Sequence, residues 1–356
     1  MRRILCVIES LGPGGAERQM AGLAVMLKQQ GYQVEVWYYD KKEFYLPYLL
    51  ENEVCSRYLS DATERGNRFL SVRKHINSYR PDTIISYSSS ASMICCVIKM
   101  FGSKFNLIVS ERNTTQKSSW RSRVRFFLYR WADYVVPNSF SQKNFINSHS
   151  PKLAKKVRTI INFVDTHAFV PKEHLPGRNI VIAATVWPSK NALGFLEALK
   201  ILKDKGLKFH VKWFGVVPDQ MEYYNKCIEL VRELGLKDYI EFLEKSKNIA
   251  DEYQAADIFC LPSFFEGTPN ALCEAMSCGL PILCSAVCDN PRYVVEGENG
   301  FLFNPLDFVD MSNAIEKALA ASNEDLLKMG LISRQKALAM FDKETFIEKY
   351  INLIEA

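Results

Sequence analysis

The chain has 356 residues, of which 48% are hydrophobic and 24% charged, and its formal net charge is +5 at pH 7. This length suits two domains better than one average core. No run approaches the eighteen or so apolar residues of a membrane span, so we expect no transmembrane helix. The apolar run after Arg2 and Arg3 is too short for a signal peptide and predicts a buried first strand.

The ten cysteines form no Cys-x-x-Cys pair, and no histidine lies at the spacing of a zinc ligand. Most of them lie in apolar runs, where a free cysteine behaves as a small buried hydrophobe. We therefore expect neither disulfides nor a metal site, and a reducing, cytoplasmic compartment.

Short apolar runs alternate with helical patterns through the first half. Strand candidates are residues 3–9, 32–39, 83–88, 105–110 and 133–138. After the first of them the stretch GPGG opens a helix whose residues Met20, Leu23, Ala24 and Leu27 share one face. The alternation predicts a parallel sheet with helices on both sides.

Gly14 and Gly15 end the GPGG stretch at the start of this helix. Glycine lets a backbone approach a phosphate closely, and a helix N-terminus offers free N–H donors. The spacing matches neither G-x-G-x-x-G nor a Walker loop. A tight strand-to-helix turn uses the same glycines, so the pattern leaves both interpretations open.

Positive charge is concentrated in the first half. From Arg112 to Arg158 the chain has eleven lysines and arginines and one acid, Asp133. A block of one sign predicts an acidic partner on one face. We expect no nucleic acid among the partners.

Residues 120–134 of this block are expected to form a helix. Its apolar face would carry Trp120, Val124, Phe127, Leu128 and Trp131. In one interpretation this face packs on the domain core. In the other, the helix meets anionic lipid or a lipid-phosphate acceptor through Arg121, Arg123, Arg125 and Arg130. Both kinds of helix share this spacing of apolar residues.

The alternation stops at residues 161–179, which are rich in proline, glycine and polar residues and read as an interdomain linker. It then resumes. Further strand candidates are residues 179–185, 208–215, 239–244, 257–263 and 281–286, with helices at 191–202 and 224–234. The last helical pattern covers residues 343–356.

The fold class is therefore α/β, with two Rossmann-like domains. We expect them at residues 1–165 and 166–342, with the helix 343–356 packing back on the first domain. In such sheets ligands bind outside the carboxyl ends of the strands. With two domains, a cleft between those ends is the expected site.

The loop from Thr185 to Asn191 lies between the first strand and the first helix of the second half. Lys190 lies near the start of that helix, where a cation is unfavourable unless an anion is close. A solvated lysine is the alternative interpretation. The position at the carboxyl end of a strand favours an anion-binding role.

The stretch SFFEGTPNALCEAMSCGLPI, residues 263–282, follows a buried strand. Thr268 is a candidate N-cap and Pro269 suits the first helical position, with the helix ending at Gly279. Glu266 and Glu274 have seven residues between them. Glu274 stands among apolar neighbours, where a carboxylate needs hydrogen-bond donors. The hydroxyls of a ribose or a hexose would supply them, whereas acids stabilising the helix dipole would explain Glu266 better than Glu274.

These residues resemble the E-x7-E signature of the retaining glycosyltransferases of family 4, which have the GT-B fold. Further similar motifs are GGAER after the first strand, NFVD at the linker, and GENGFLFNP near residue 300. They occur in the family's order and extend over nearly the whole chain. The resemblance is more specific in the second half than in the first.

The resemblance implies a role for each matching residue. Glu274 would bind the ribose hydroxyls of a nucleotide-sugar donor, and Glu266 the hydroxyls of its sugar on the reacting face. Gly14 and Gly15 would approach the diphosphate from the other domain. The backbone that would hold the sugar and diphosphate comprises Gly267, Thr268, Pro269, Asn270, Ala271 and Leu272.

Two positions depart from the family pattern. The loop that usually reads G-R-L-x-x-x-K-G keeps Lys190 but has Thr185 in place of the arginine. After the strand at 105–110, Arg112 stands where a histidine is often found near the reacting centre. Arg112 could replace the missing phosphate cation or meet the acceptor, and we count it with Glu266 and Lys190 as a candidate catalytic residue.

The implied activity is transfer of a sugar from a nucleotide donor, with UDP the expected nucleotide, with retention of configuration. The acceptor would be a glycan or a lipid-phosphate-linked glycan in assembly of a surface polysaccharide or glycolipid. No cofactor or metal is expected, because no D-x-D or acidic cluster is present. The protein is expected in the cytoplasm or peripherally on the inner face of the membrane. The alternatives are a nucleotide-sugar epimerase of the same fold and a catalytically impaired partner subunit.

Overall fold

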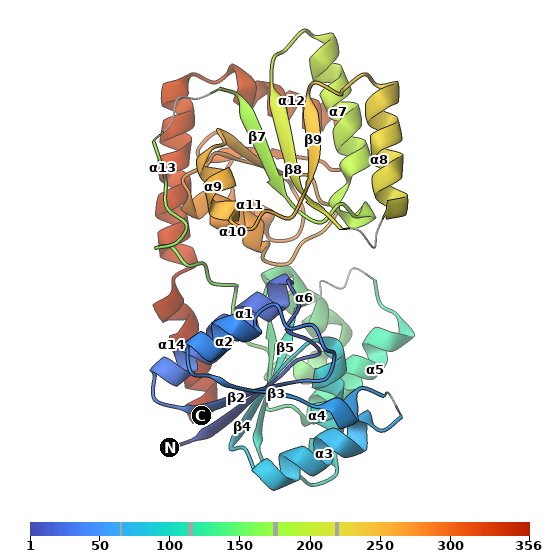
Figure 1. Cartoon of the computed structure of the whole chain (residues 1–356), viewed down its shortest axis with the longest axis vertical. Helices are drawn as coiled ribbons and strands as arrows, with labels where there is room; N and C mark the ends of the chain where they lie inside the picture. Colours follow the sequence, from blue (N-terminus) through green and yellow to red (C-terminus); the bar gives the residue numbers. More distant parts are fainter. Residues whose placement is uncertain (65, 113–116, 174–176, 218–220) are drawn as a thin grey trace. The chain divides into compact units, whose positions relative to one another are not determined.

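The computed structural model describes residues 1–64, 66–112, 117–173, 177–217 and 221–356. It divides the chain into two compact units, each with its own sheet (Figure 1). Unit 1 comprises Met1–Asn162 and Glu344–Ala356, and unit 2 comprises Phe163–Lys343. Residues 174–176 of the expected linker lie outside the described residues. The roles expected for the two domains stay predictions.

Unit 1 has a six-stranded sheet. Its strands are β1 (Arg3–Val7), β2 (Gln33–Tyr38), β3 (Cys55–Tyr58), β4 (Thr83–Tyr87), β5 (Asn106–Glu111) and β6 (Tyr134–Pro137). Its helices are α1 (Gly15–Gln29), α2 (Leu46–Glu51), α3 (Arg68–Tyr79), α4 (Ser89–Met100), α5 (Trp120–Leu128), α6 (Phe140–His149) and α14 (Lys343–Glu355). Its short 3-10 turns are η1 (Ser60–Ala62), η2 (Tyr129–Trp131) and η3 (Pro151–Leu153).

The strands expected in the first half form, and α1 buries the predicted face with Met20, Leu23, Ala24 and Leu27. The sequence pattern missed β3, an edge strand that pairs only with β2 and has no fully buried residue. An edge strand buries less apolar surface than a central strand does. Its sequence therefore lacks the apolar run that is typical of the central strands. The helix expected at 120–134 ends earlier, because η2 and then β6 follow α5.

Unit 2 also has a six-stranded sheet. Its strands are β7 (Asn179–Ala183), β8 (His210–Val216), β9 (Ile240–Glu244), β10 (Ile258–Leu261), β11 (Ile282–Ser285) and β12 (Gly300–Phe303). Its helices are α7 (Ala192–Asp204), α8 (Met221–Glu233), α9 (Ile249–Gln254), α10 (Asn270–Ser277), α11 (Asn290–Tyr293), α12 (Phe308–Ala320) and α13 (Asn323–Met340), with the 3-10 turn η4 (Pro188–Lys190).

The two sheets share one topology. Unit 1 has the order β3-β2-β1-β4-β5-β6, and unit 2 read from β9 has the order β9-β8-β7-β10-β11-β12. All the strand pairs are parallel. This is the order 3-2-1-4-5-6 of a Rossmann fold, in which ligands bind where the strand order reverses. That switch point lies between β1 and β4 in unit 1 and between β7 and β10 in unit 2.

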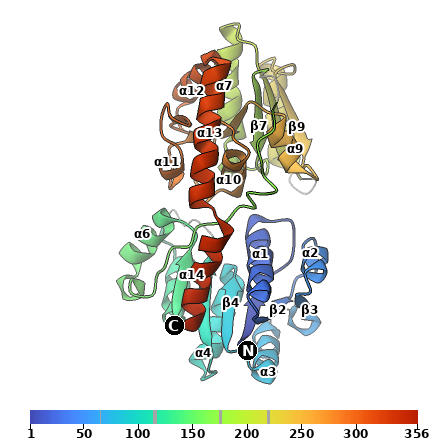
Figure 2. The same cartoon turned by 90° about the vertical axis from the view of Figure 1, so that its left-hand side faces the viewer.

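Helices cover both faces of each sheet, because strands buried on both sides need two apolar covers. In unit 1, α3, α4 and α5 contribute buried residues such as Val72, Cys95 and Phe126 to one hydrophobic cluster. Helices α1 and α14 lie over the other face (Figure 2). In unit 2, Phe195 of α7 and Ile315 of α12 belong to the cluster on one face, and α10 packs with α13.

No helix in the described part of the chain is both long enough and apolar enough to cross a membrane.

Candidate active site

The switch point of unit 2 brings together two loops that the sequence singled out. The loop after β7 contains Lys190, and the loop after β10 contains Glu266. Because β7 and β10 are neighbours in a parallel sheet, their carboxyl ends open at the same edge. The topology thus juxtaposes two side chains that are 76 positions apart in the chain.

The two loops are joined by their backbones as well as by their side chains. The N–H of Phe264 donates to the carbonyl of Ser189 at 2.9 Å. Ser285 at the end of β11 donates its hydroxyl to the carbonyl of Ser263 at 2.6 Å. Asn191 ends the 3-10 turn in the left-handed region, with φ 58°, a conformation that asparagine tolerates better than most residues. These bonds position the Lys190 and Glu266 backbones.

Lys190 and Glu266 form an ion pair with 2.5 Å between Nζ and Oε1. The Lys190 side chain is 25% exposed and that of Glu266 is 11% exposed. The pair is therefore partly screened from water but open on one side. An ammonium has three donors, so Lys190 can serve a second anion while it remains near the carboxylate.

Glu274 lies in α10, about one turn from its start, and is only 3% exposed. The phenol of Tyr253 donates a hydrogen bond to its Oε2 at 3.3 Å. Burying a carboxylate is costly without donors, and Tyr253 supplies one. The sequence did not indicate Tyr253, because it lies in α9 at no fixed spacing from Glu274.

The expected capping of this helix is wrong by one residue. Pro269 is the N-cap of α10, in an extended conformation, and Asn270 is the first helical residue. Thr268 is buried and its hydroxyl hydrogen-bonds that of Tyr293 at 3.1 Å. Burial raises the pKa of the Tyr293 phenol well above its usual range, so the hydroxyl stays protonated. Proline fixes φ near the value a helix needs, but here it comes just before the first turn.

The other residues whose backbone is predicted to hold the sugar and diphosphate lie in the first turn of this helix or just before it. Gly267 and Pro269 precede α10, and Asn270, Ala271 and Leu272 form its first turn. N–H groups in a first helical turn lack partners within the helix. Thr185 is half-buried just beyond β7, so the position that has arginine in the family carries no charge here.

Three exposed aromatic residues lie close to Lys190 or Glu266 along the chain, and the sequence patterns did not indicate them. Trp187 precedes Lys190 by three residues and is 47% exposed, while Phe264 and Phe265 immediately precede Glu266. Their place directly after two predicted strands, where polar loop residues are usual, is the sequence signal that could have identified them. Their flat apolar faces suit a sugar ring or a base.

Gly14 and Gly15 lie in unit 1 at the corresponding switch point. Gly14 is the N-cap of α1 and Gly15 is its first residue, as the GPGG pattern predicted. The carboxylate of Glu17 lies against Gly14, since a Cβ added there would come within 2.1 Å of Glu17 Oε2. The Glu17 carboxylate thus occupies space beside the N-terminus of α1, and the role of the two glycines at a diphosphate stays a prediction.

Arg112 is surrounded by neutral groups of unit 1. Its guanidinium donates to Ser110 Oγ at 2.7 Å, Asn162 Oδ1 at 2.6 Å, Tyr87 OH at 2.7 Å and Tyr350 OH at 2.9 Å. Burial raises the pKa of Tyr87 well above its usual range, so this partner stays neutral. Four of the five N–H donors of an arginine are thus engaged, which favours a structural role. A role at the diphosphate or acceptor stays a prediction.

The structure corrects the expected orientation of the basic helix. Trp120, Val124 and Phe127 are exposed, so the interpretation in which they pack on the core is wrong. Leu128 and Trp131 are half-buried and do pack against the unit 1 cluster. Arginines 121, 123 and 130 are exposed. Arg125 points inward instead. Only 13% of its side chain is exposed, and its Nε lies 3.3 Å from Glu111 Oε2. Arg125 therefore stabilises the fold and is not part of the exposed basic surface.

The position of α10 depends on α13. Arg334 donates to the carbonyls of Ser277 and Phe169 at 2.7 Å each, so a cation neutralises the C-terminal end of α10. A Cβ on Gly330 would come within 2.0 Å of the carbonyl oxygen of Gly279. Glycine is required for this approach of two backbones, and the sequence offered no sign of it.

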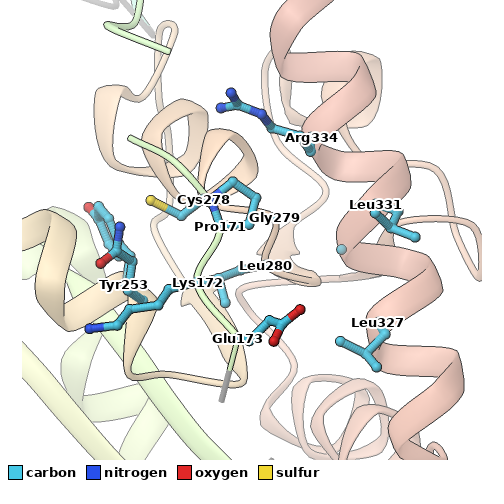
Figure 3. A pocket seen from close by; sticks show the side chains of 12 residues that line it. Pro171, Lys172, Glu173, Tyr253, Cys278, Gly279, Leu280, Leu327, Leu331 and Arg334 are labelled. Carbon is cyan, nitrogen blue, oxygen red and sulfur yellow. The ribbon is translucent and has the colours of Figure 1, made fainter. Parts of the chain in front are cut away.

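A pocket of about 640 Å³ lies beside this contact, with Pro171, Leu280 and Leu331 among its lining residues. Figure 3 shows the side chains of α13 on one side of the pocket and the segment from Pro171 to Glu173 on the other. It adjoins the C-terminal end of α10, whereas Glu266 precedes the N-terminal end. It is therefore separate from the ion pair.

All ten cysteines are free, and eight of them are buried, as their apolar contexts predicted. Within the described ranges, no group of three or more His, Cys, Asp or Glu side chains could hold a metal ion.

The family described as Glycosyl transferases group 1 matches residues 166–335, and Glycosyltransferase Family 4 matches residues 13–168. Together these matches cover both units. The chain is a glycosyltransferase and belongs to the family 4 type, with two Rossmann-like domains of the GT-B fold.

Two curated relatives from Campylobacter jejuni cover almost the same length. The alpha-1,4-N-acetyl-D-galactosaminyltransferase acting on GalNAc-alpha-(1->4)-GalNAc-alpha-(1->3)-diNAcBac-PP-undecaprenol is 26% identical and covers 99% of this chain and 98% of its own. The N-acetylgalactosamine-N,N'-diacetylbacillosaminyl-diphospho-undecaprenol 4-alpha-N-acetylgalactosaminyltransferase is 25% identical over 91% of both chains. Among solved structures, Anabaena HepE in complex with UDP-glucose has a TM-score of 0.88 at 18% identity and covers 100% of both chains.

Proposed function

We propose that this enzyme transfers a sugar from a UDP-linked donor to an acceptor linked to undecaprenol diphosphate. The observation that carries the donor half is the Lys190–Glu266 pair at the switch point of unit 2, with Glu274 buried in the helix that follows. The acceptor half rests on the two Campylobacter relatives, whose names specify diphospho-undecaprenol acceptors. The nucleotide is suggested by the UDP and UDP-glucose bound in structures of the same fold.

In this proposal each part of the site meets one part of the donor. Glu274 accepts hydrogen bonds from the ribose hydroxyls, and Glu266 accepts them from the hydroxyls of the sugar. Lys190 and the N–H groups at the start of α10 compensate the charge of the diphosphate. Because Lys190 already lies 2.5 Å from Glu266, one ammonium links the sugar-binding carboxylate to the leaving group.

The chemistry follows from where charge develops. When the bond between the sugar and the β-phosphate breaks, negative charge grows on the leaving diphosphate, and preorganised donors stabilise it. The Lys190 ammonium can take this role without a metal ion, so we propose metal-independent transfer. Retention of configuration requires that the acceptor hydroxyl attack the face that the diphosphate leaves.

Two alternative functions would give different products from those of sugar transfer. A nucleotide-sugar epimerase would alter the donor without an acceptor, and the family matches favour transfer over epimerisation. A catalytically impaired partner subunit, suggested by Thr185 in place of arginine, would bind the donor and release nothing. The paired Lys190 and Glu266 favour an active enzyme.

The test has two stages. Thermal stabilisation by a series of nucleotide sugars first identifies the donor, since a ligand that binds the native state raises its stability. Release of UDP is then measured with and without a diphospho-undecaprenol-linked glycan. We expect release to depend on the acceptor, and NMR of the product to show the anomeric configuration of the donor. UDP release without acceptor, or inversion, would refute the proposal, and Glu266→Gln serves as the control with lowered turnover.

A further inference from the structure

The hydrogen bond to Glu274 comes from a side chain that is fully buried. Tyr253 is 0% exposed, and its hydroxyl donates to Glu274 Oε2 at 3.3 Å. The two residues lie in different helices, α9 and α10. Burying a hydroxyl without a partner is costly, and a phenylalanine would fill the same apolar space. The hydroxyl of Tyr253 is therefore explained by the carboxylate and not by packing.

The ring of Tyr253 is held by its neighbours. The centre of the Phe169 ring lies 6.2 Å from its centre, and that of Phe259 in β10 lies 5.9 Å away in an edge-to-face contact. The next residue of α9, Gln254, donates its side-chain amide to the carbonyl of Val170 at 2.9 Å. A side chain packed in this way has little freedom to move. The hydroxyl of Tyr253 therefore points at the carboxylate from a fixed place.

The kind of donor matters for what the carboxylate can bind. Glu266 faces the ammonium of Lys190, and a cation neutralises the charge of its partner. The phenol of Tyr253 is a neutral donor, so it orients the Glu274 carboxylate without neutralising it. An ionised carboxylate has two oxygens with about four lone pairs, and Tyr253 uses one of them. Hydroxyls of a ligand that bond to the same carboxylate make charge-assisted hydrogen bonds, which are the strong ones.

We propose that Tyr253 is a positioning residue, which fixes the Glu274 carboxylate for the two adjacent hydroxyls of a ribose and so makes the site reject 2′-deoxyribose. The inference rests on the proposed function, because it takes the ribose of a UDP-linked donor as the ligand of Glu274. A site built to hydrogen-bond a hydroxyl rejects an analogue that lacks it, since a polar group is left unpaired. A carboxylate that can rotate adjusts to a single hydroxyl and discriminates less.

The first experiment measures binding of UDP and of 2′-deoxy-UDP to the full chain by calorimetry. The unchanged protein should prefer UDP on the order of 30-fold, the effect of one hydrogen bond to a charged group. Tyr253→Phe keeps the ring and removes the hydroxyl. This variant should bind UDP roughly fivefold more weakly and should prefer it over the 2′-deoxy form by only about threefold, because the carboxylate is no longer fixed.

The preference for UDP separates positioning from a merely structural role. A variant that is only less stable lowers the amount of native protein for both nucleotides alike, so their ratio of affinities does not change. Tyr239→Phe is the matched control. Tyr239 lies just before β9, at the opposite edge of the sheet, and its half-buried ring packs on Phe209. Loss of its hydroxyl should change neither affinity.

A double-mutant cycle shows whether Tyr253 acts through Glu274. In the Glu274→Gln background, Tyr253→Phe should weaken UDP binding by less than about twofold further, because the two changes remove parts of one interaction. Independent effects that multiply would overturn the proposal, and so would an unchanged preference for UDP in Tyr253→Phe.

The same measurements distinguish this inference from the proposed function. If the unchanged protein binds UDP but accepts 2′-deoxy-UDP equally well, the inference is wrong and a UDP-linked donor still stands. If the unchanged protein binds neither nucleotide, the donor in the proposed function is wrong and the inference falls with it.

Discussion

The carboxyl edges of the two sheets share a topology and differ in their chemistry. In unit 2 the cation Lys190 faces the carboxylate Glu266 from a neighbouring loop, and both side chains keep some exposure. In unit 1 the cation Arg112 donates to four neutral oxygens that include Tyr87 and Tyr350. A basic residue after a Rossmann strand is therefore available to a ligand only if the surrounding side chains leave donors open.

The two cations differ because different segments surround them at the carboxyl edges of the two sheets. Tyr350 belongs to α14 and Asn162 is the last residue of unit 1 before the chain enters unit 2. Both contact Arg112, so the guanidinium ties the returning helix and the end of the first segment to β5. In the described part of unit 2, the ammonium of Lys190 bonds only to Glu266 in the neighbouring loop and does not hold distant segments together.

The largest expected effect is that of removing Lys190. Lys190→Ala should cost about 2–4 kcal/mol in transition-state stabilisation, the range for losing one preorganised donor. The loss should fall mainly on kcat, since leaving-group charge grows as the bond breaks. Steady-state kinetics with the true donor measure it. Lys200→Ala on the outer part of α7 is the control. Activity within about twofold of the unchanged enzyme would mean that the diphosphate is held elsewhere.

A second variant tests whether a cation at another position can replace Lys190. Thr185→Arg in the Lys190→Ala background places a guanidinium at the end of β7, where the family has arginine. We expect part of the lost kcat to return, because either side chain can neutralise the leaving group. Thr185→Gln is the uncharged control. Equal kcat with arginine and glutamine would exclude this position from the diphosphate site.

Arg112→Met should lower the free energy of unfolding, in contrast to Lys190→Ala, which should lower kcat. It leaves the hydroxyls of Tyr87 and Tyr350 and the Asn162 amide without their cationic donor, at a cost of about 2–3 kcal/mol in the free energy of unfolding. Urea denaturation measures this cost. The KM for the donor should stay unchanged. Arg112→Lys should recover only part of the stability, because an ammonium cannot reach all four acceptors. Unchanged stability with a collapse of turnover would assign Arg112 to the substrate.

Gly330→Ala tests whether α13 positions the helix that carries Glu274. The added methyl group would come within 2.0 Å of the Gly279 carbonyl oxygen, and overpacking of this kind costs about 1–3 kcal/mol. Unfolding experiments should show the loss, and nucleotide affinity should fall with it. Leu331→Ala, at the next position and exposed, should change stability by less than about 0.5 kcal/mol. An undisturbed Gly330→Ala protein would contradict the close helix contact.

A modest effect on UDP binding should separate the two glutamates. Glu274→Gln should weaken binding of UDP about tenfold, because one carboxylate acceptor for the ribose is lost at a cost of about 1.4 kcal/mol. Glu266→Gln should leave UDP affinity unchanged and lower turnover. Calorimetry with UDP measures both variants. Equal loss of UDP affinity in the two would reject the assignment of ribose to one carboxylate and sugar to the other.

Much of this fold was predictable from sequence because central parallel strands are buried on both faces and read as apolar runs. The strands that were missed, β3 and β12, lie at the sheet edges and carry fewer buried side chains. The E-x7-E segment was also predictable, since its strand, loop and helix follow one another along the chain. The exact start of α10 was not, because Thr268 bonds Tyr293 instead of capping the helix.

The alternation of strands and helices, the places of Lys190 and Glu266 in loops after strands, the place of Glu274 in the helix that follows, and the spacing of Trp120, Val124 and Phe127 could all be read from the sequence. These are local properties, set by periodicity and by neighbours along the chain. The contact between Lys190 and Glu266, the four hydrogen bonds of Arg112 to neutral groups, and the outward orientation of Trp120, Val124 and Phe127 depend on the tertiary structure. Periodicity tells which residues share a helix face, but the partners that cover one face come from distant segments, here β5 and α4 through Glu111 and Ser89.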